Sequence, residues 1–135
     1  MAENNFLLNI ITPEDVFYSG EARTVVVRTV SGDVGLMKNH APYVAPLGIG
    51  KLEIIADGKK RYAVISQGYV KCDKSGVQIL TDTAEWAENI DVTRAESAKN
   101  RAESRLASKE ANVDRLRAEV ALQKAIQRIN ISELK

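Results

Sequence analysis

The sequence predicts an α+β fold in which a sandwich or flattened barrel of short β-strands is followed by an antiparallel pair of helices. Over residues 1–88, short runs of apolar and β-branched residues alternate with turn residues, a spacing typical of such β-structures. Residues 91–135 contain neither Gly nor Pro, and their apolar residues recur at steps of three and four, as on one face of a helix. We therefore expect a β-domain over residues 1–88 and a helical hairpin over residues 89–135.

The expected strands begin with Phe6–Ile11, a mainly apolar run that stops at Thr12 and Pro13. The strongest candidate is Ala22–Val30, because four of its residues are β-branched valines bounded by turn residues. The other strand candidates are residues 16–18, 51–56, 61–65, 69–72 and 77–80. This succession of short strands is the basis for expecting a sandwich or barrel.

Two local signals constrain how these strands pair. Asp57 and Gly58 lie between two strand candidates and favour a two-residue β-hairpin turn. Pro42 and Pro46 lie within the stretch Leu36–Leu47, and proline has no backbone N–H to donate to a neighbouring strand. Strand pairing in that stretch is therefore expected at a sheet edge or with an interruption.

The first helix is expected to have a narrow, alanine-rich apolar face, and either Asn89 or Asp91 is placed to cap its start. A polar break at residues 108–112 separates it from a second helix with a broader apolar face. The two faces comprise Val92, Ala95, Ala98, Ala102 and Leu106 in the first helix, and Val113, Leu116, Ala118, Val120, Ala121, Leu122, Ala125, Ile126 and Ile129 in the second. Small residues let the two helices approach closely, while the second helix should also bury surface against the β-domain or another subunit. A helical pair of this size has little core of its own, so its detachment is energetically feasible.

Composition argues against several classes of function. The net charge is +1 over 135 residues, so no overall field favours nucleic acid or an anionic membrane. Residues 91–135 hold 10 Lys and Arg against 7 Asp and Glu, which makes the hairpin mildly basic. Cys72 is the single cysteine, which rules out an internal disulfide and fits a reducing compartment. No apolar run approaches the ~18 residues that cross a bilayer, so membrane association is expected only through a protein partner.

No residues have the spacing of a catalytic or metal site. His40 is the only histidine, and a lone histidine in a turn-rich stretch is more often a hydrogen-bonded packing residue than a catalyst. No Cys and His pair has the spacing of metal ligands. Gly50 and Lys51 do not form a phosphate-binding loop, because Ala45 and Leu52 replace the first glycine and the Ser or Thr of that motif. We therefore expect no catalytic and no metal-binding residues.

Residues 90–95, where the two patterns meet, include the residue types of a nucleotide site. Asp91 and Arg94 are three residues apart and share a helix face, with Arg101 two turns further along. A carboxylate can accept hydrogen bonds from ribose or an adenine amino group, and arginine matches phosphate oxygens bidentately. In the structural alternative, Asp91 caps the helix and Arg94 makes an exposed ion pair worth under ~1 kcal/mol. Spacing alone favours that alternative, since a nucleotide site also needs groups from elsewhere, such as Arg128 facing Arg94 from the second helix.

Several motifs follow one another in a recognisable order over almost the whole chain. They are Thr12-Pro13-Glu14, Gly32-Asp33-Val34-Gly35-Leu36, His40-Ala41-Pro42, Ser66-Gln67-Gly68-Tyr69-Val70, residues 77–85 and residues 117–128 of the last helix. In this order and spacing, the chain resembles the epsilon-subunit family of bacterial and chloroplast-type F-type ATP synthases. The resemblance implies a β-sandwich of about ten strands followed by a helical hairpin.

The resemblance also implies a non-catalytic role on the rotor of that enzyme. Subunits of this family clamp the gamma subunit and the membrane ring of c subunits, couple ion flow to rotation and restrain ATP hydrolysis. Asp33 and His40 match the family's loop that lies towards the c ring, so both are expected to contact it. The expected location is the cytoplasmic face of the cell membrane, reached through the complex, and no cofactor is required.

ATP is the regulatory ligand that the resemblance implies. Residues at the family's ATP-sensing motif are Ile90, Asp91, Arg94 and Ala95, and those at its other ATP-binding positions are Glu85, Arg101, Lys124 and Arg128. Lys124 stands where the family often has arginine, which keeps the charge but loses the planar fork. With this match, nucleotide binding becomes the favoured interpretation of the segment over simple helix capping.

The expected mechanism gives the hairpin two positions. In the compact position ATP bridges both helices, and in the extended position the hairpin reaches along gamma towards the catalytic alpha and beta subunits. There Arg115, Arg117, Lys124 and Arg128 would meet an acidic surface and block rotation. Two other functions stay open at this point, namely a stand-alone nucleotide-binding regulatory module and a static structural adaptor whose hairpin never moves.

Overall fold

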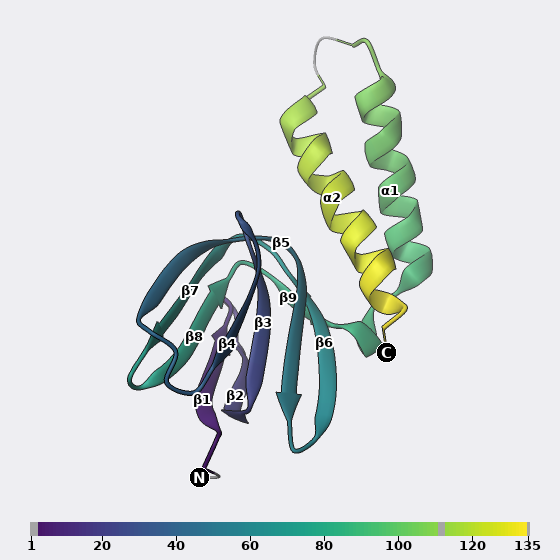
Figure 1. Cartoon of the computed structure of the whole chain (residues 1–135). Coiled ribbons are helices and arrows are strands. Elements are labelled where there is room, and N and C mark those ends of the chain that lie inside the picture. Colours follow the sequence, from purple (N-terminus) through teal and green to yellow (C-terminus); the bar gives the residue numbers. More distant parts are fainter. Residues whose placement is uncertain (1–2, 111–112, 135) are drawn as a thin grey trace.

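A computed structural model describes residues 3–110 and 113–134 of the chain and confirms the predicted fold class (Figure 1). The strands are β1 (Phe6–Ile11), β2 (Val16–Ala22), β3 (Thr24–Thr29), β4 (Gly32–Met37), β5 (Tyr43–Ala56), β6 (Lys59–Ile65), β7 (Gly68–Asp73), β8 (Gly76–Thr81) and β9 (Ala84–Trp86). A short 3-10 helix, η1 (Ala87–Asn89), leads into α1 (Val92–Ala107) and α2 (Arg115–Ser132). The described residues thus form nine strands where about ten were expected, and two helices.

The sandwich consists of two sheets that share one long strand. In one sheet the order is β2-β1-β8-β7-β5, and in the other it is β4-β3-β5-β6-β9. β5 pairs with β7 through Tyr43–Pro46 and with β6 through Gly50–Ala56, so it passes from one sheet to the other. Pro46 lies where the pairing with β7 ends, so the interruption expected from its missing N–H occurs at this corner.

The turn between β5 and β6 has the local geometry that its sequence predicts. Asp57 and Gly58 are the two residues between the strands, and their φ angles are 52° and 72°. Positive φ at both central positions is the requirement of the two-residue hairpin turn that best matches strand twist. The turn fixes the register of β6, whose far end supplies one wall of the site described below.

The core of the sandwich is built from inward-facing aliphatic side chains of both sheets. Alternate residues of β1 and β3 are buried, as expected for strands with one face on a core. The largest fully buried side chains of the sandwich include Leu8, Ile10, Val25, Val27, Leu36, Leu52, Ile54, Ile65, Val70 and Ile79. Trp86 packs onto the edge of this core, stacked on Phe17 at 4.3 Å between ring centroids and covered by the guanidinium of Arg61.

The two helices form the predicted antiparallel hairpin (Figure 1). Their buried alanines are Ala95 and Ala102 in α1, and Ala118 and Ala125 in α2. Each helix starts with an aspartate cap: the carboxylate of Asp91 accepts from the backbone N–H of Arg94, and that of Asp114 from the N–H of Arg117. The cap by Asp91 was predicted as one of two alternatives, whereas the cap by Asp114 was not. Part of the predicted break, residues 111–112, lies outside the described residues.

Within the described part of the chain, the hairpin contacts the strands of the sandwich chiefly through α2, which packs near β5 and β6, and its tip projects away (Figure 1). A small second core forms at this contact, and Tyr62 packs against it. Its members are Val64 of β6, Ala87 of η1, Ile131 of α2, and Ile90, which lies between η1 and α1. This cluster is separate from the core of the sandwich. The hairpin is therefore attached through a small apolar contact plus the polar contacts of the seam.

Candidate functional site at the seam between sandwich and hairpin

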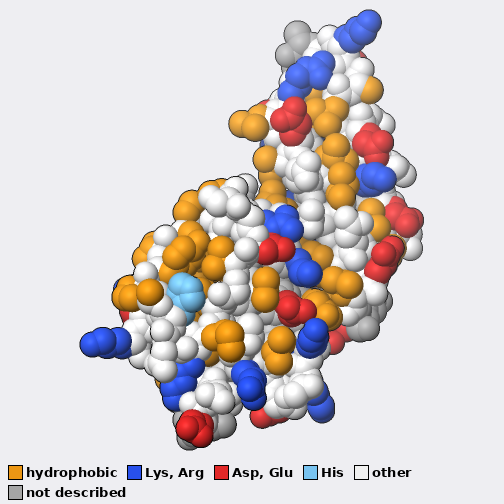
Figure 2. All heavy atoms as spheres, viewed as in Figure 1, with side chains coloured by type: hydrophobic (Ala, Val, Ile, Leu, Met, Phe, Trp, Pro, Cys, Tyr) orange, Lys and Arg blue, Asp and Glu red, His pale blue; other side chains and the backbone are white. Residues whose placement is uncertain are grey.

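A cleft of about 350 Å³ lies between the sandwich and α2. Its sandwich side comes from the end of β6 and the start of β9, and its other side from α2. The lining residues are Val64, Ile65, Ser66, Thr83, Ala84, Glu85, Lys124 and Arg128. Its volume lies at the lower end of the range of small-molecule sites. Acidic and basic side chains gather at this junction on the surface (Figure 2).

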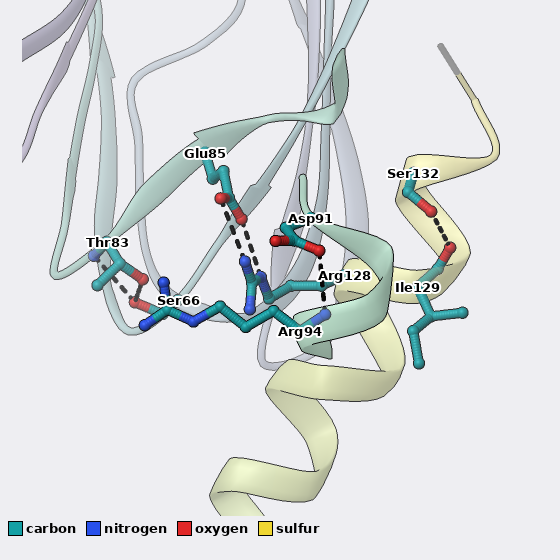
Figure 3. Close-up of polar contacts among 8 residues, drawn as sticks. All are labelled: Ser66, Thr83, Glu85, Asp91, Arg94, Arg128, Ile129 and Ser132. Atoms are coloured by element: carbon teal, nitrogen blue, oxygen red, sulfur yellow. Dashed lines mark hydrogen bonds and ion pairs between the residues drawn. The ribbon is translucent and has the colours of Figure 1, made fainter. Parts of the chain in front are cut away.

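Glu85 and Arg128 join the two walls of the cleft directly. The Arg128 guanidinium donates from Nε to Glu85 Oε1 at 2.9 Å and from Nη2 to Glu85 Oε2 at 3.2 Å (Figure 3). The two side chains are 23% and 33% exposed, so this bidentate pair is partly shielded from water. The structure therefore brings two predicted nucleotide-binding residues together, but it pairs them with each other.

Lys124 supplies a second positive charge to the same cleft. It lies four residues before Arg128, so both side chains project from one side of α2. None of the ion pairs within 4.0 Å in residues 3–110 and 113–134 includes Lys124. With Arg128 neutralised by Glu85, the Lys124 ammonium is the charge in this cleft that can meet an anion without first breaking a contact.

A network of hydroxyl groups fixes the corner of the sandwich that presents Glu85. Ser66 is buried, and its Oγ accepts from the backbone N–H of Thr83 at 3.1 Å and lies 2.8 Å from Thr83 Oγ1 (Figure 3). The backbone N–H of Ser66 donates to Thr81 Oγ1 at 3.1 Å. Sequence reasoning did not single out Ser66 or Thr83. The one local signal was the pair of threonines, Thr81 and Thr83, that closely precedes Glu85.

The residues of the predicted ATP-sensing motif have mainly structural positions here. Ile90 belongs to the second core, Asp91 caps α1, and Ala95 is fully buried at the interface of the two helices. Arg94 is exposed, and its side chain points back across the seam in the direction of Ser66 and Thr83 (Figure 3). Arg94 is thus the member of this motif whose functional group is available to a ligand near the cleft.

The structure leaves the remaining predicted cations of the hairpin away from the cleft. Arg101 is exposed on α1 and does not line the cleft. Arg115 donates to the carbonyl oxygens of Leu106 and Ser108 at 2.7 and 2.6 Å, so its guanidinium caps the end of α1. Arg117, near the tip, is exposed. In this conformation Arg115 is therefore occupied within the hairpin.

Asp33 and His40, the predicted c-ring contacts, lie at opposite ends of β4. Asp33 accepts from Arg28 Nε at 2.6 Å across the β3–β4 ladder. The stem of Arg28 packs over Gly50, where an added Cβ would lie 2.8 Å from Arg28 Cγ. Of the segment between the two predicted contact residues, the part up to Met37 belongs to strand β4, and Lys38 and Asn39 form a turn before His40.

His40 follows a tight turn in which Asn39 has a φ of 66° and the His40 N–H donates to the Met37 carbonyl. Its exposed ring lies edge-on to Tyr43 and beside apolar side chains on the surface of the sandwich (Figure 2). His40 also lines a second cavity of about 600 Å³, which Cys72 borders from β7. Burial, together with the charge of Asp73, raises the pKa of the Cys72 thiol, which disfavours the reactive thiolate form.

Two further features bear on the class of site. The described residues include no group of three or more His, Cys, Asp or Glu that could hold a metal ion. No helix within 3–110 and 113–134 is long and apolar enough to span a membrane. The cleft itself is lined by the cations of Lys124 and Arg128, which are groups that can bind an anion.

Comparison with known families assigns both parts of the chain. Residues 5–87 match the family described as "ATP synthase, Delta/Epsilon chain, beta-sandwich domain". Residues 88–133 match the companion family described as "ATP synthase, Delta/Epsilon chain, long alpha-helix domain". The two matches meet between residues 87 and 88, and together they span nearly all of the chain.

Curated relatives and solved structures agree with these matches. The ATP synthase epsilon chain of Shouchella clausii is 44% identical over 128 residues, which cover 95% of each chain. That of Syntrophomonas wolfei is 42% identical over 134 residues, which cover 98% of each chain. A chain in the cryo-EM structure of the Euglena gracilis mitochondrial ATP synthase, OSCP/F1/c-ring, has a TM-score of 0.83 and 26% identity, with 97% of this chain and 82% of that chain covered. A chain of the Tetrahymena thermophila central stalk and c-ring shares the fold at a TM-score of 0.56 and 11% identity, with 96% and 94% covered. The resemblance found in the motifs is confirmed, and the chain belongs to the ATP synthase delta/epsilon chain family.

Proposed function

We propose that this chain is a non-catalytic subunit of the central stalk of an F-type ATP synthase, whose helical hairpin responds to ATP and restrains ATP hydrolysis. Family membership supports the place in the enzyme, and the Euglena gracilis match adds that a chain of this shape occurs in an F1/c-ring assembly. In this role the sandwich attaches to the gamma subunit and the c ring. The attachment gives the chain its contact with the membrane, at the cytoplasmic face.

The attachment of the hairpin supports two positions. The sandwich has its own large core, while the described contacts of the hairpin with it are the small cluster around Ile131, the Glu85–Arg128 pair and the packing of α2 near β5 and β6. Breaking this contact exposes little apolar surface relative to unfolding the sandwich. The hairpin can then extend towards the alpha and beta subunits and present Arg115, Arg117, Lys124 and Arg128 to them.

The cleft is the observation that supports ATP sensing. Its walls come from both the sandwich and α2, so it exists only while the hairpin is docked. Lys124 and Arg128 of α2 lie opposite Glu85, Ser66 and Thr83 of the sandwich side. Phosphate oxygens fit the two cations, and ribose or adenine amino groups fit a carboxylate. The 350 Å³ cleft accommodates part of a nucleotide, and the rest would lie outside it, on the side towards which Arg94 points (Figure 3).

A ligand at this site biases the hairpin by linkage. If ATP binds only the docked position, ATP at 100 times its dissociation constant stabilises that position by about 2.7 kcal/mol. This value is comparable to the gap of a few kcal/mol that separates two positions held by a small contact. A site of modest affinity is therefore sufficient for a sensor.

Two measurements test the regulatory role. ATP titration of the isolated full chain should show saturable binding at millimolar concentrations or below, and the Arg94→Ala variant should bind more weakly. In the reconstituted synthase, deletion of residues 91–135 should raise ATPase activity. Equal ATP binding by Arg94→Ala defeats the sensing proposal, and unchanged ATPase activity defeats the inhibitory one.

Association with gamma separates the proposal from its alternatives. A central-stalk subunit should co-purify with gamma at micromolar concentration or tighter, whereas a stand-alone nucleotide-binding module should not. A static adaptor should bind gamma but keep its distances between hairpin and sandwich unchanged on addition of ATP.

A further inference from the structure

Arg128 is the cation of the cleft that could bind a phosphate bidentately, but in this structure it is already paired with Glu85. Both oxygens of Glu85 accept from Arg128, at 2.9 and 3.2 Å, and the donors Nε and Nη2 form one edge of the guanidinium. Only 23% of the Arg128 side chain is exposed. A phosphate group that sought the same edge of the guanidinium would meet the carboxylate there.

We propose that Glu85 is an internal competitor for Arg128, a carboxylate latch that holds the hairpin docked when the cleft contains no ligand and that a phosphate group displaces. The latch itself is independent of ATP, whereas the displacement rests on the proposed function. Glu85 and a phosphate both carry negative charge and both match the planar fork of arginine. In a partly shielded cleft they cannot share one edge of the guanidinium without strong repulsion.

The position of the pair explains why it acts as a latch. Glu85 is in β9, which pairs with β6 and is fixed by the hydroxyl network of Ser66 and Thr83. Arg128 is in α2, one turn before the Ile131 anchor of the second core. The two residues are 43 positions apart in the chain, so their contact forms only when the hairpin lies on the sandwich. Lys124 lines the same cleft and forms no ion pair with the described residues. It can therefore bind an incoming anion before the Glu85–Arg128 pair breaks.

The competition gives Glu85 two effects of opposite sign. Without ligand, the pair stabilises the docked hairpin, so loss of the carboxylate should loosen it. With a phosphate ligand, the wild-type chain must give up the Glu85–Arg128 contact on binding, and a chain without the carboxylate need not. The same substitution should therefore loosen the empty docked state and tighten phosphate binding. A residue with only a structural role would weaken both.

The test uses the full chain and tripolyphosphate as the probe. Tripolyphosphate has no ribose or base, so it removes the hydrogen bonds that Glu85 could accept from a nucleoside. The Glu85→Gln variant should bind tripolyphosphate about threefold more tightly or better, as expected for loss of a competing partly exposed ion pair. Without ligand, amides of α2 in this variant should exchange hydrogen faster than in wild type, while those of the sandwich core should not change.

Glu88→Gln is the matched control. Glu88 also pairs with an arginine near the seam, at 3.1 Å to Arg61, but both partners belong to the sandwich side. This variant should leave tripolyphosphate affinity and α2 exchange at wild-type values. Arg128→Gln should speed α2 exchange and also weaken tripolyphosphate binding, because it removes the cation that both anions share.

The outcomes separate the latch from the proposed ATP response. Unchanged α2 exchange in Glu85→Gln overturns the latch. Equal or weaker tripolyphosphate binding by that variant overturns the displacement. A wild-type chain that binds neither ATP nor tripolyphosphate overturns displacement and ATP sensing together, while the exchange measurement still decides the latch alone.

Discussion

The sandwich and the hairpin are held together by different kinds of contact. The sandwich buries large aliphatic side chains of two sheets, and its strands are joined by ladders that span distant parts of the sequence. The hairpin buries mainly alanines between its helices and adds one large anchor, Ile131, against the sandwich. The difference teaches that one chain can concentrate its buried aliphatic core in one domain and leave a second segment docked through a much smaller core.

Two optical probes can follow the two regions separately. Trp86 is the only tryptophan, and it packs on Phe17 and the core of the sandwich, so its fluorescence reports on that domain. The described helical residues belong almost entirely to the hairpin, so far-UV circular dichroism at helical wavelengths reports mainly on the hairpin. The predictions that follow use this separation.

The largest effect is expected in the core of the sandwich. Leu52 is fully buried in β5, the strand that both sheets share. Leu52→Ala should lower the free energy of unfolding of the sandwich by about 2–5 kcal/mol, through lost burial and the cavity left behind. Urea denaturation followed by Trp86 fluorescence measures this loss. A loss below ~1 kcal/mol would contradict the division between a strong sandwich and a weakly held hairpin.

A smaller and more local effect is expected at the anchor of the hairpin. Ile131→Ala should weaken hairpin docking by about 2 kcal/mol, at the low end for a buried isoleucine because the second core is small. The helical signal should be lost at lower urea, while the Trp86 transition stays in place. Leu116→Ala is the control, because Leu116 is 72% exposed and contributes to neither core. A shift of both transitions together would mean that the two regions unfold as one unit.

An effect of about 1 kcal/mol is expected at the helix caps. Asp91→Ala and Asp114→Ala each remove an N-cap that accepts a backbone N–H at 3.0 Å. Asp91→Asn should keep most of the cap while removing the charge. ATP binding that is lost in Asp91→Asn, with helicity retained, would assign the carboxylate to the ligand. If ATP affinity falls only as far as helix content falls in all three variants, Asp91 acts as a helix cap and not as a ligand of ATP.

The elements that could be predicted from the sequence are those set by neighbouring residues. Asp57 and Gly58 specify their turn because the two positions themselves require positive φ. The cap by Asp91 depends on an amide three residues away, and the alanine faces of the helices follow from helical periodicity. In each case the deciding contact is local, or the pattern repeats along one element.

The parts that could not be predicted depend on how distant elements dock. Arg128 was named as a group that could face Arg94, but its pairing with Glu85, 43 residues away, was not foreseen because that contact depends on how α2 docks on the sandwich. Ser66 and Thr83 meet across 17 residues through the pairing of strands. Asp33 and His40 were treated as one loop, and the strand between them was not foreseen, because its glycines resemble turn residues. Only the three-dimensional arrangement distinguishes these alternatives.

The smallest effect on stability is expected at the β3–β4 hairpin, where the Asp33–Arg28 pair is about one-third exposed. Asp33→Asn and Arg28→Gln each break this pair, and each should cost under ~1 kcal/mol of unfolding free energy. Both variants remove the same ion pair and should lose similar stability. A difference between them in assembly therefore reports on the Asp33 carboxylate itself.

If Asp33 contacts the c ring, Asp33→Asn should weaken co-purification of the chain with the membrane-bound part of the synthase, while Arg28→Gln should weaken it less. Equal losses in the two variants would show that the orientation of the pair matters rather than the carboxylate alone. Wild-type assembly in both would remove Asp33 from the expected contact and leave His40, at the other end of β4, as the remaining candidate. In that case only the His40 end of β4 would contact the c ring. The strand keeps Asp33 and His40 apart, so one of them can lie at the ring without the other.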